Sequence, residues 1–500
     1  MAKYDVAIIG SGLGGLLCGS ILTREGFNVI ILEKNSQPGG CLQSYRRDGH
    51  IFDTGIHYIG SLDEGQILDR YFKYFGIRDK LNLKRMNDKA FDIIRYSDGS
   101  SYELGMGYDN FKTSLEEYFP KEKQAIGKYI STMQSLCKAF PLYNLDTKYE
   151  SFKEISHFNI NAHRYFSELT TDSKLQNLLA ATNFNYAGRS DKTPFYVHSL
   201  ITNSFINSSW RPVDGSGQIA LLLTDQIIEN GGTIRTNANV TAIKLKSDSG
   251  KASSVVINRR ENIEANWIIS DIHPSGTLSL LSDLYPVRLL NERLEQMENT
   301  MGAFTLNGYF KKDSFPYLNS NYFFHPQGNP WYDLNTPNKS IPGSFVFLTP
   351  SYSNSNEFAD TFTIMTAMDF DLVKKWQHTK IGSRGKEYLE LKGRFAEHLV
   401  ENADKIFPGF RTNIERTYTS TPLSWLDYTG TPDGSMYGIL KDSNDPMRTM
   451  VFPKNRIPNL LFTGQNVILH GVIGVTIGAV QTCSEILGME YLIDKITEAS

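Results

Sequence analysis

The chain has 500 residues, with 51 Lys and Arg against 54 Asp and Glu, so its formal net charge is −3. This length predicts two closely joined domains, and the charge argues against nucleic acid as a partner, which would require a basic excess. The four cysteines, Cys18, Cys41, Cys137 and Cys483, have no paired spacing, so we expect no disulfide framework and no metal site, and we place the protein in the cytoplasm.

The first predicted element is a short buried strand over residues 5–9, which begins too early to leave room for a secretory leader. A glycine-rich turn over residues 10–15 follows, and the next stretch has apolar residues at helical spacing until Gly26. A second buried strand, residues 28–32, then ends at Glu33. This order predicts a strand–turn–helix–strand unit that binds a dinucleotide.

Each glycine of the turn has a physical task in such a unit. Gly10 allows the tight turn out of the strand, Gly12 lets the backbone approach a pyrophosphate, and Gly15 permits close helix–strand packing. Free N–H groups and the positive helix end then face the phosphates. Glu33 stands where an acid accepts from a ribose hydroxyl, which argues against NADP. The predicted contacts here are Gly10, Ser11, Gly12, Leu13, Gly14, Gly15, Glu33 and Lys34.

A second glycine pair, Gly39-Gly40, follows the acid and leads into Cys41 and Ser44. It resembles the extended fingerprint of two-dinucleotide-binding-domain flavoproteins, in which this loop runs beside FAD, so FAD is the implied cofactor. Residues 49–58 are similar to an element of the phytoene desaturase, amine oxidase and retinol saturase superfamily. The sequence FDTGIHYIG over residues 52–60 looks closest to the retinol saturase and carotenoid isomerase branch.

The resemblance implies an α/β fold in which a Rossmann-type, amine oxidase-like FAD-binding domain carries an inserted α+β substrate domain. It adds Gly39, Gly40, Cys41 and Ser44 to the expected cofactor contacts. Cys41 could carry a covalent link to the flavin, but we interpret it as a small buried residue.

The middle of the chain changes character. Residues 67–75 and 111–136 show helical patterns, and residues 92–96 and 101–104 flank a turn and predict a hairpin. Residues 151–207 are again largely helical and rich in aromatics. We expect this insertion to cap a substrate cavity, although most of its aromatics, Phe152, Phe158, Tyr165, Phe166, Phe184, Tyr186, Phe195 and Tyr196, are better interpreted as its core.

A Gly-Ser turn at residues 215–217, a helix over 218–229 and a paired glycine return the chain to the first domain. In the superfamily a strand follows, with a valine whose backbone meets the adenine, and Val240 matches that valine. Residues 252–258 and 262–270 then predict a second hairpin.

The second half of the substrate domain is expected over residues 276–455. Its strands are predicted at 305–310, 344–348 and 361–367, and an amphipathic helix at 387–407. Residues 421–440, rich in Gly, Pro, Tyr and Trp, predict an irregular loop that lines a site. The sequence of residues 431–438 also resembles that of retinol saturases.

The chain closes with a buried strand over residues 459–463, a turn at Gly464-Gln465, and a helix expected from Thr476 to about Lys495. In the superfamily this helix end faces the flavin, which implies contacts from Gly464, Gln465, Gly471, Val472, Ile473 and Gly474. Other branches often carry an acid where Gln465 stands. The apolar run over residues 467–487 is interrupted by glycines, Gln481 and Glu485, so we predict a buried loop and helix and no membrane span.

The predicted FAD-binding domain is discontinuous and comprises residues 1–66, 208–275 and 456–500. The predicted substrate domain comprises residues 67–207 and 276–455.

The resemblance implies an FAD-dependent oxidoreductase that saturates, desaturates or isomerises carbon–carbon double bonds of an apolar isoprenoid or polyene. His57, Tyr58 and His470 are the candidate acid–base residues, with packing or hydrogen bonding as the alternative for each. The rival functions are a flavin amine oxidase and a non-catalytic escort of the same fold that binds prenylated partners. An apolar substrate also predicts peripheral association with the inner face of a membrane, and the electron partner stays open.

Overall fold

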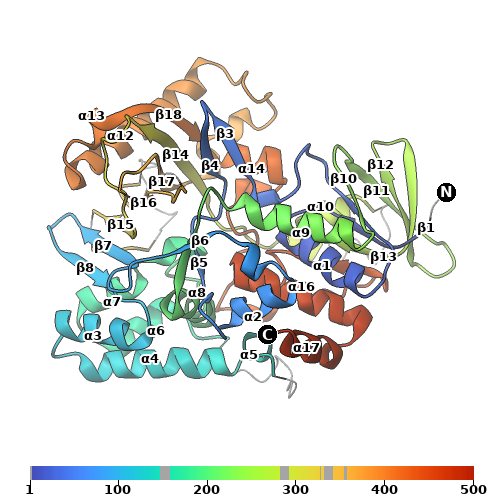
Figure 1. Ribbon diagram of the computed structural model, residues 1–500, viewed down its shortest axis with the longest axis horizontal. Helices are drawn as coiled ribbons and strands as arrows, with labels where there is room; N and C mark the ends of the chain where they lie inside the picture. Colours follow the sequence, from blue (N-terminus) through green and yellow to red (C-terminus); the bar gives the residue numbers. More distant parts are fainter. Residues whose placement is uncertain (1–2, 147–157, 282–291, 327, 332–341, 354–356) are drawn as a thin grey trace.

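The computed structural model describes residues 3–146, 158–281, 292–326, 328–331, 342–353 and 357–500. Its first large sheet, on the right of Figure 1, has seven strands. In spatial order these are β10 (Thr233–Arg235), β2 (Val29–Leu32), β1 (Lys3–Ile9), β13 (Glu261–Ser270), β12 (Ala252–Ile257) and β11 (Val240–Leu245), with β19 (Leu460–Phe462) also beside β13. β10, β2, β1, β13 and β19 are parallel, whereas β11 and β12 are antiparallel additions.

The predicted strand–turn–helix–strand unit is confirmed as β1, α1 (Leu13–Arg24) and β2. The turn needs glycine at Gly10, whose φ of 92° lies in the left-handed region. At Gly15 a Cβ atom would lie 2.3 Å from the Gly10 carbonyl oxygen. The third glycine of the fingerprint therefore permits the close helix–strand packing that its position predicts.

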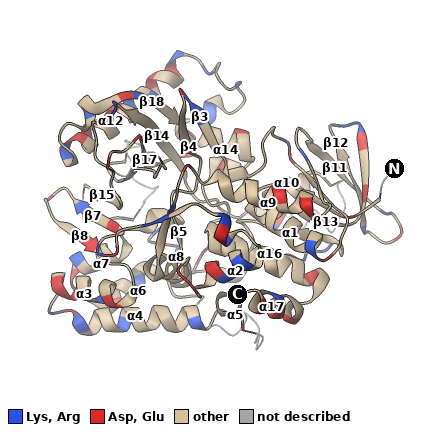
Figure 2. Cartoon of the chain, viewed as in Figure 1, with Lys and Arg blue, Asp and Glu red and all other residues tan. Residues whose placement is uncertain are grey.

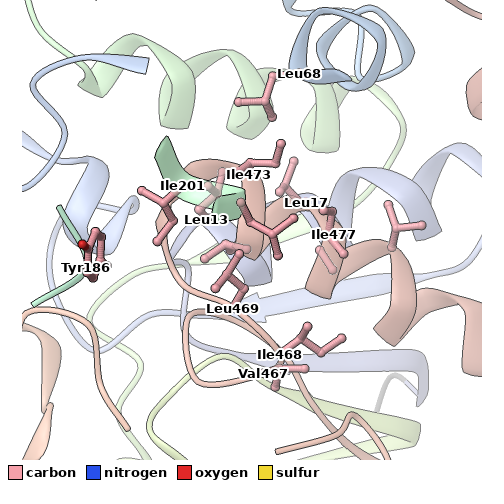
Figure 3. Close-up of a cluster of buried hydrophobic side chains, with 14 of the residues drawn as sticks. Leu13, Leu17, Leu68, Tyr186, Ile201, Val467, Ile468, Leu469, Ile473 and Ile477 are labelled. Carbon is pink, nitrogen blue, oxygen red and sulfur yellow. The ribbon is translucent and has the colours of Figure 1, made fainter. Parts of the chain in front are cut away.

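Helix α16 (Gly471–Leu487) packs against α1, which also contacts α9 (Gly217–Glu229). Figure 3 shows Leu13 and Leu17 of α1 beside Ile473 and Ile477 of α16. The predicted helix start at Thr476 is wrong, because the glycines of the first turns allow α16 to begin close to the preceding loop. A Cβ at Gly474 would lie 2.6 Å from the Leu469 carbonyl carbon.

The predicted end of this helix is also wrong. Gly488, with a φ of 93°, separates α16 from α17 (Met489–Glu498). The apolar run before it is a buried loop and helix, as predicted. Across the described residues we find no helix that combines the length and apolarity needed to cross a bilayer.

The second large sheet lies in the upper left of Figure 1 and has seven strands. Their order is β18 (Ile414–Ser420), β14 (Gly302–Phe310), β17 (Thr361–Met368), β16 (Phe345–Leu348), β15 (Asn321–His325), β7 (Asp92–Tyr96) and β8 (Ser101–Leu104). The β15–β7 pair is parallel and the other pairs are antiparallel. Both the predicted hairpin and the predicted strands of this region are confirmed.

The two faces of this sheet have different partners, as the two-residue period of a strand requires. Phe345 and Phe347 of β16 belong to an apolar cluster that includes the buried face of α12 (Lys386–Ile406). Val346 belongs to the other, larger core of the molecule and, with Leu348, lines a cavity. The sheet therefore forms one wall of the cavity.

Helices cover the lower left of Figure 1 and include most of the predicted insertion. They are α2 (Ile67–Tyr74), α3 (Tyr108–Tyr118), α4 (Lys123–Lys138), α5 (Pro141–Asn144), α6 (Ala162–Leu169), α7 (Ser173–Ala180), α8 (Phe195–Asn207) and the short 3₁₀ helices η2 (Arg78–Lys80) and η4 (Asn183–Tyr186). The aromatics predicted as core are buried at Phe158, Phe166, Phe184, Tyr186, Phe195 and Tyr196, whereas Tyr165 is half-buried. Phe152 lies outside the described residues.

Two smaller sheets connect these layers. One pairs β3 (Ser44–Arg47) with β4 (His50–Asp53), and the other has the order β5 (Ile59–Gly60), β9 (Ser209–Pro212) and β6 (Leu83–Arg85). The remaining short elements are η1 (Gly40–Leu42), α10 (Pro274–Ser279), η5 (Phe370–Leu372), η6 (Lys374–Trp376), α13 (Phe410–Asn413) and α15 (Pro446–Thr449). The strands of each large sheet come from the segments assigned to one predicted domain, and the division into domains itself stays a prediction.

The prediction of an irregular loop over residues 421–440 is wrong for its first half. This part forms α14 (Pro422–Thr429), and the 3₁₀ helix η7 (Pro432–Gly434) follows. The residues that suggested a loop instead begin and end this helix. The Thr421 side chain accepts a hydrogen bond from the Leu423 N–H, and Pro422 occupies the first turn. Gly430 ends the helix at a φ of 73°. The segment does line the cavity, through Trp425, Tyr437 and their neighbours.

Candidate active site

One continuous cavity joins the fingerprint turn to the second sheet. It is lined by Gly10, Ser11, Gly12, Leu13, Gly14, Glu33, Lys34, Gly40, Cys41, His57, Tyr58, Val240, Gly464, Gln465, His470, Gly471, Val472 and Ile473, all of which the sequence predicts as site residues. Its other end is walled by apolar side chains: Leu68, Ile201, Phe205, Ala303, Val346, Leu348 and Met365. Segments from both predicted domains therefore meet around a single space.

Four predicted cofactor residues, Gly15, Gly39, Ser44 and Gly474, are not part of the cavity lining and support its walls instead. Gly39, at a φ of 121°, donates its N–H to the Ser11 carbonyl over 2.9 Å and so holds the second glycine turn against the first. Ser44 donates its hydroxyl to Asp53 over 2.7 Å.

Glu33 is buried, with 5% of its surface exposed, and connects the first glycine turn to the loop that follows β2. Its Oε2 accepts from the N–H and the hydroxyl of Ser11 at 3.1 and 2.6 Å, and its Oε1 accepts from the Asn35 N–H at 2.8 Å. A carboxylate has about four acceptor positions. Capacity remains for a ribose hydroxyl, and that contact stays a prediction.

Asp271 is a site residue that sequence reasoning missed. Its carboxylate lies within the fingerprint, because Cβ atoms added at Gly12, Gly14 and Gly464 would come within 2.5, 2.5 and 2.3 Å of its oxygens. Burial raises the pKa of Asp271 to about 7, while hydrogen bonds from the Gly15 and Gly12 backbone act to lower it. The glycines therefore make room for this acid as well as for a ligand, and only its place after β13 gave a signal.

Two helix N-termini open into the cavity. The N-cap residues are Gly12 for α1, which has no side chain, and His470 for α16, whose side chain makes no capping hydrogen bond. At α1 the Asp271 carboxylate accepts from the Gly12 and Gly15 backbone, and the remaining N–H groups and the positive partial charge of both helix starts favour an anion. Together with the side-chain-free surface of the glycine turns, these ends fit the pyrophosphate and the polar ring edge of an FAD molecule.

Both candidate histidines are held neutral by burial. Burial, reinforced by the charge of Arg211, lowers the pKa of His57 to about 4, and burial with the charge of Lys441 lowers the pKa of His470 to about 3. Both ring nitrogens of His57 lack a hydrogen-bond partner among the described residues, and so does the Nε2 atom of His470. At neutral pH each ring offers one donor and one acceptor and cannot serve as a cationic acid.

Tyr58 differs from the histidines, because burial raises its pKa well above the usual value. Its ring stacks on Phe205 with 4.2 Å between centroids, and its hydroxyl accepts from Asn185 Nδ2 over 2.6 Å. Tyr58 therefore keeps its proton and holds it beside the apolar end of the cavity.

Cys41 lines the cavity, and burial raises the pKa of its thiol to about 12. Since the thiolate is the reactive form, this thiol is a weak nucleophile at neutral pH. The environment favours the interpretation of Cys41 as a small buried residue over a covalent flavin link.

Asn185 and Tyr437 also line the cavity and were not predicted. The Tyr437 ring packs against the His470 ring in a tilted arrangement with 4.5 Å between centroids. Its position within the retinol saturase-like segment 431–438 was the available signal. Asn185 lies in η4, within the largely helical stretch that was predicted to cap the cavity, but no motif singled out this residue. In the described part of the chain, no group of His, Cys, Asp and Glu could hold a metal ion.

Charged residues of both signs are distributed along the chain. Figure 2 shows Lys and Arg interspersed with Asp and Glu along the helices and strands in view.

Comparison with known proteins agrees with this geometry. Residues 13–307, more than half of the chain, match the family described as flavin containing amine oxidoreductase. All-trans-retinol 13,14-reductase of Rattus norvegicus is 26% identical over 97% of this chain and 86% of its own length. Chloroplastic prolycopene isomerase 1 of an Oncidium hybrid cultivar is 24% identical over 99% of this chain and 85% of its own. Among solved structures, an oxidoreductase from Methanosarcina mazei superposes with a TM-score of 0.65 at 16% identity, covering 96% of this chain and 99% of that one.

Proposed function

Since the chain belongs to the flavin-containing amine oxidoreductase family, we propose that it is an FAD-dependent oxidoreductase that acts on carbon–carbon double bonds of an apolar isoprenoid or polyene. The reaction is a saturation, a desaturation or an isomerisation. The similarity to a retinol reductase and a prolycopene isomerase supports this class of substrate.

The observation that carries the proposal is the shape of the cavity. Its fingerprint end offers glycine turns and the N-termini of two helices, which suit FAD, and its other end is apolar. When bound, the flavin supplies the hydride or electron transfer that no side chain can perform. The chain supplies a dry wall that holds a long apolar molecule in line with the ring.

The polar residues between the two ends have separate tasks in this proposal. The neutral rings of His57 and His470 provide hydrogen bonds rather than positive charge. Tyr58, whose pKa is raised, stays protonated, and its hydroxyl oxygen accepts a hydrogen bond from Asn185 at the cavity wall.

The rival amine oxidase function would require a site for a positively charged amine. Among the described residues that line the cavity, the carboxylates are Glu33 and Asp271, and both lie at the fingerprint end. An ammonium group at the apolar end would be buried without a counter-charge, which is costly. The escort function is disfavoured by the intact glycine turns, since an escort has no need of an FAD site.

The first test concerns the cofactor. The purified protein is expected to be yellow and to release FAD on heating, identified by its mass. Recovery of NAD, or no binding when FAD is offered in excess, would contradict the proposal.

The second test concerns the substrate. Anaerobic incubation of the reduced and the oxidised protein with retinoids and carotenoids, followed by chromatography, is expected to yield a product that differs in the number or the geometry of its double bonds. Turnover of primary amines with no change in any polyene would support the rival function instead.

A further inference from the structure

A chain of buried polar side chains begins at Arg211 in β9. This side chain is fully buried, and its guanidinium donates to the Ser320 carbonyl over 3.0 Å and to Asn321 Oδ1 over 2.9 Å. A guanidinium can only donate hydrogen bonds. The contact therefore fixes the Asn321 amide with its oxygen toward Arg211 and its NH₂ group away from it.

The second step connects two strands of the large sheet. Asn321 of β15 and Asp92 of β7 are direct neighbours in the parallel ladder. The Asn321 NH₂ group donates to Asp92 Oδ1 over 2.8 Å, and a hydrogen bond from the Tyr58 hydroxyl is among the causes that act to lower the pKa of Asp92. An ionised carboxylate only accepts, so the charge of Asp92 favours the orientation in which the Tyr58 hydroxyl donates toward it.

The third step reaches the cavity. With its proton directed to Asp92, the Tyr58 oxygen can only accept, and it does so from Asn185 Nδ2 over 2.6 Å. The orientation of the Asn185 amide is thereby fixed as well. Within the described part of the chain, no group hydrogen bonds to Asn185 Oδ1, and both Asn185 and Tyr58 line the cavity.

We propose that Asn185 is a specificity-determining residue, whose side-chain oxygen accepts a hydrogen bond from a hydroxyl group on an otherwise apolar substrate. This inference rests on the proposed function and narrows its substrate class to polyene alcohols. An aldehyde and a hydrocarbon have no proton to donate and leave the oxygen unpaired, which is the arrangement by which buried polar groups discriminate strongly.

The direction of the chain depends on an ionised Asp92. Burial raises the pKa of Asp92 to about 7, while Asn321, Arg211 and Tyr58 act to lower it. Below that pH a protonated Asp92 could donate to Tyr58 and release the amide. Measurements at pH 8 keep the carboxylate ionised and the acceptor in place.

The test measures binding rather than turnover. The FAD-loaded protein is titrated at pH 8 with all-trans-retinol, all-trans-retinal and the hydrocarbon in which hydrogen replaces the retinol hydroxyl. The alcohol is expected to bind about tenfold more tightly than the other two, since one net hydrogen bond is worth about that factor. Asn185→Leu is expected to remove the preference without weakening binding of the hydrocarbon. Asn402→Leu, on the outer helix α12, should leave the preference unchanged.

Tyr58→Phe provides a second variant if Asn185→Leu fails to fold. Without the phenol oxygen the Asn185 amide is free to turn, so the aldehyde is expected to bind as tightly as the alcohol. A wild-type protein that binds all three probes equally, or that prefers the aldehyde, would overturn the inference and leave the proposed function standing. Failure to bind any of them would instead remove the proposed substrate class, and the inference with it.

Discussion

The two ends of the cavity are built in different ways. At the fingerprint end the lining is mostly backbone and comes from short contiguous stretches, such as residues 10–14. At the apolar end it is formed by apolar residues that come from segments as distant as Leu68, Ile201, Val346 and Met365. One end is thus a local motif, and the other is a product of packing between layers.

This contrast explains where variation is tolerated. A side chain added at Gly14 or Gly15 would meet backbone atoms of Gly464 or Gly10, which cannot move aside. A wall of apolar side chains changes shape gradually with each substitution and allows one FAD site to serve different substrates. Variants at the two ends are therefore expected to separate cofactor binding from substrate binding.

The largest effect is expected from Gly14→Ala at the fingerprint end. The new Cβ would lie 2.5 Å from Asp271 Oδ1 and 2.7 Å from the Gly464 backbone, so the two turns must separate. Overpacking of this kind costs about 1–3 kcal/mol, and we expect the FAD dissociation constant to rise by about one to two orders of magnitude. Titration of the apo-protein with FAD measures the change. Gly127→Ala in α4, where an added Cβ meets no atom within 4 Å, is the matched control, and equal losses in both variants would refute the argument.

A smaller effect is expected from Val346→Phe at the apolar end, and it should weaken substrate binding instead of FAD binding. The larger ring would occupy space on the cavity side of β16, and the affinity for a polyene is expected to fall about tenfold, in line with the cost of overpacking. FAD affinity should stay at the wild-type value, because no fingerprint atom is displaced. Leu389→Phe, at an exposed position of α12, controls for the added ring. Weakened FAD binding in Val346→Phe would show that the two ends are coupled.

The smallest effect is expected from a change of pH, which tests how the charge of Asp271 affects FAD affinity at the fingerprint end. Asp271 has a pKa raised to about 7 by burial, so it gains negative charge as the pH rises through that value. The FAD pyrophosphate is also negative, and like charges repel. We expect FAD affinity to fall several-fold between pH 6 and pH 8. In Asp271→Asn the affinity should be the same at both pH values, and a pH dependence that survives this substitution would have another source.

The sequence by itself determined the elements whose cause is local. The strand–turn–helix–strand unit and the left-handed glycine at Gly10 follow from apolar periodicity and from glycine spacing. The glycine fingerprint and the resemblance in residues 52–60 and 431–438 led to the family and to part of the residues that line the cavity.

Local signals also misled where one residue type has two uses. Pro422 and Gly430 suggested an irregular loop in the sequence, whereas in the structure they lie at the beginning and the end of α14. The glycines of α16 read as helix breakers, whereas Gly474 lets the helix start close against Leu469.

Only the tertiary structure decided what depends on segments that are distant in sequence. It placed the Asp271 carboxylate among the fingerprint glycines, and it left His57 neutral through burial beside Arg211. It also placed Asn321 and Asp92 side by side on neighbouring strands, where they form a hydrogen bond. The orientation of the Asn185 amide depends on its hydrogen bond to Tyr58, which is likewise a tertiary contact. Burial and hydrogen-bond direction are properties of neighbours in space, and a linear pattern of residue types does not contain them.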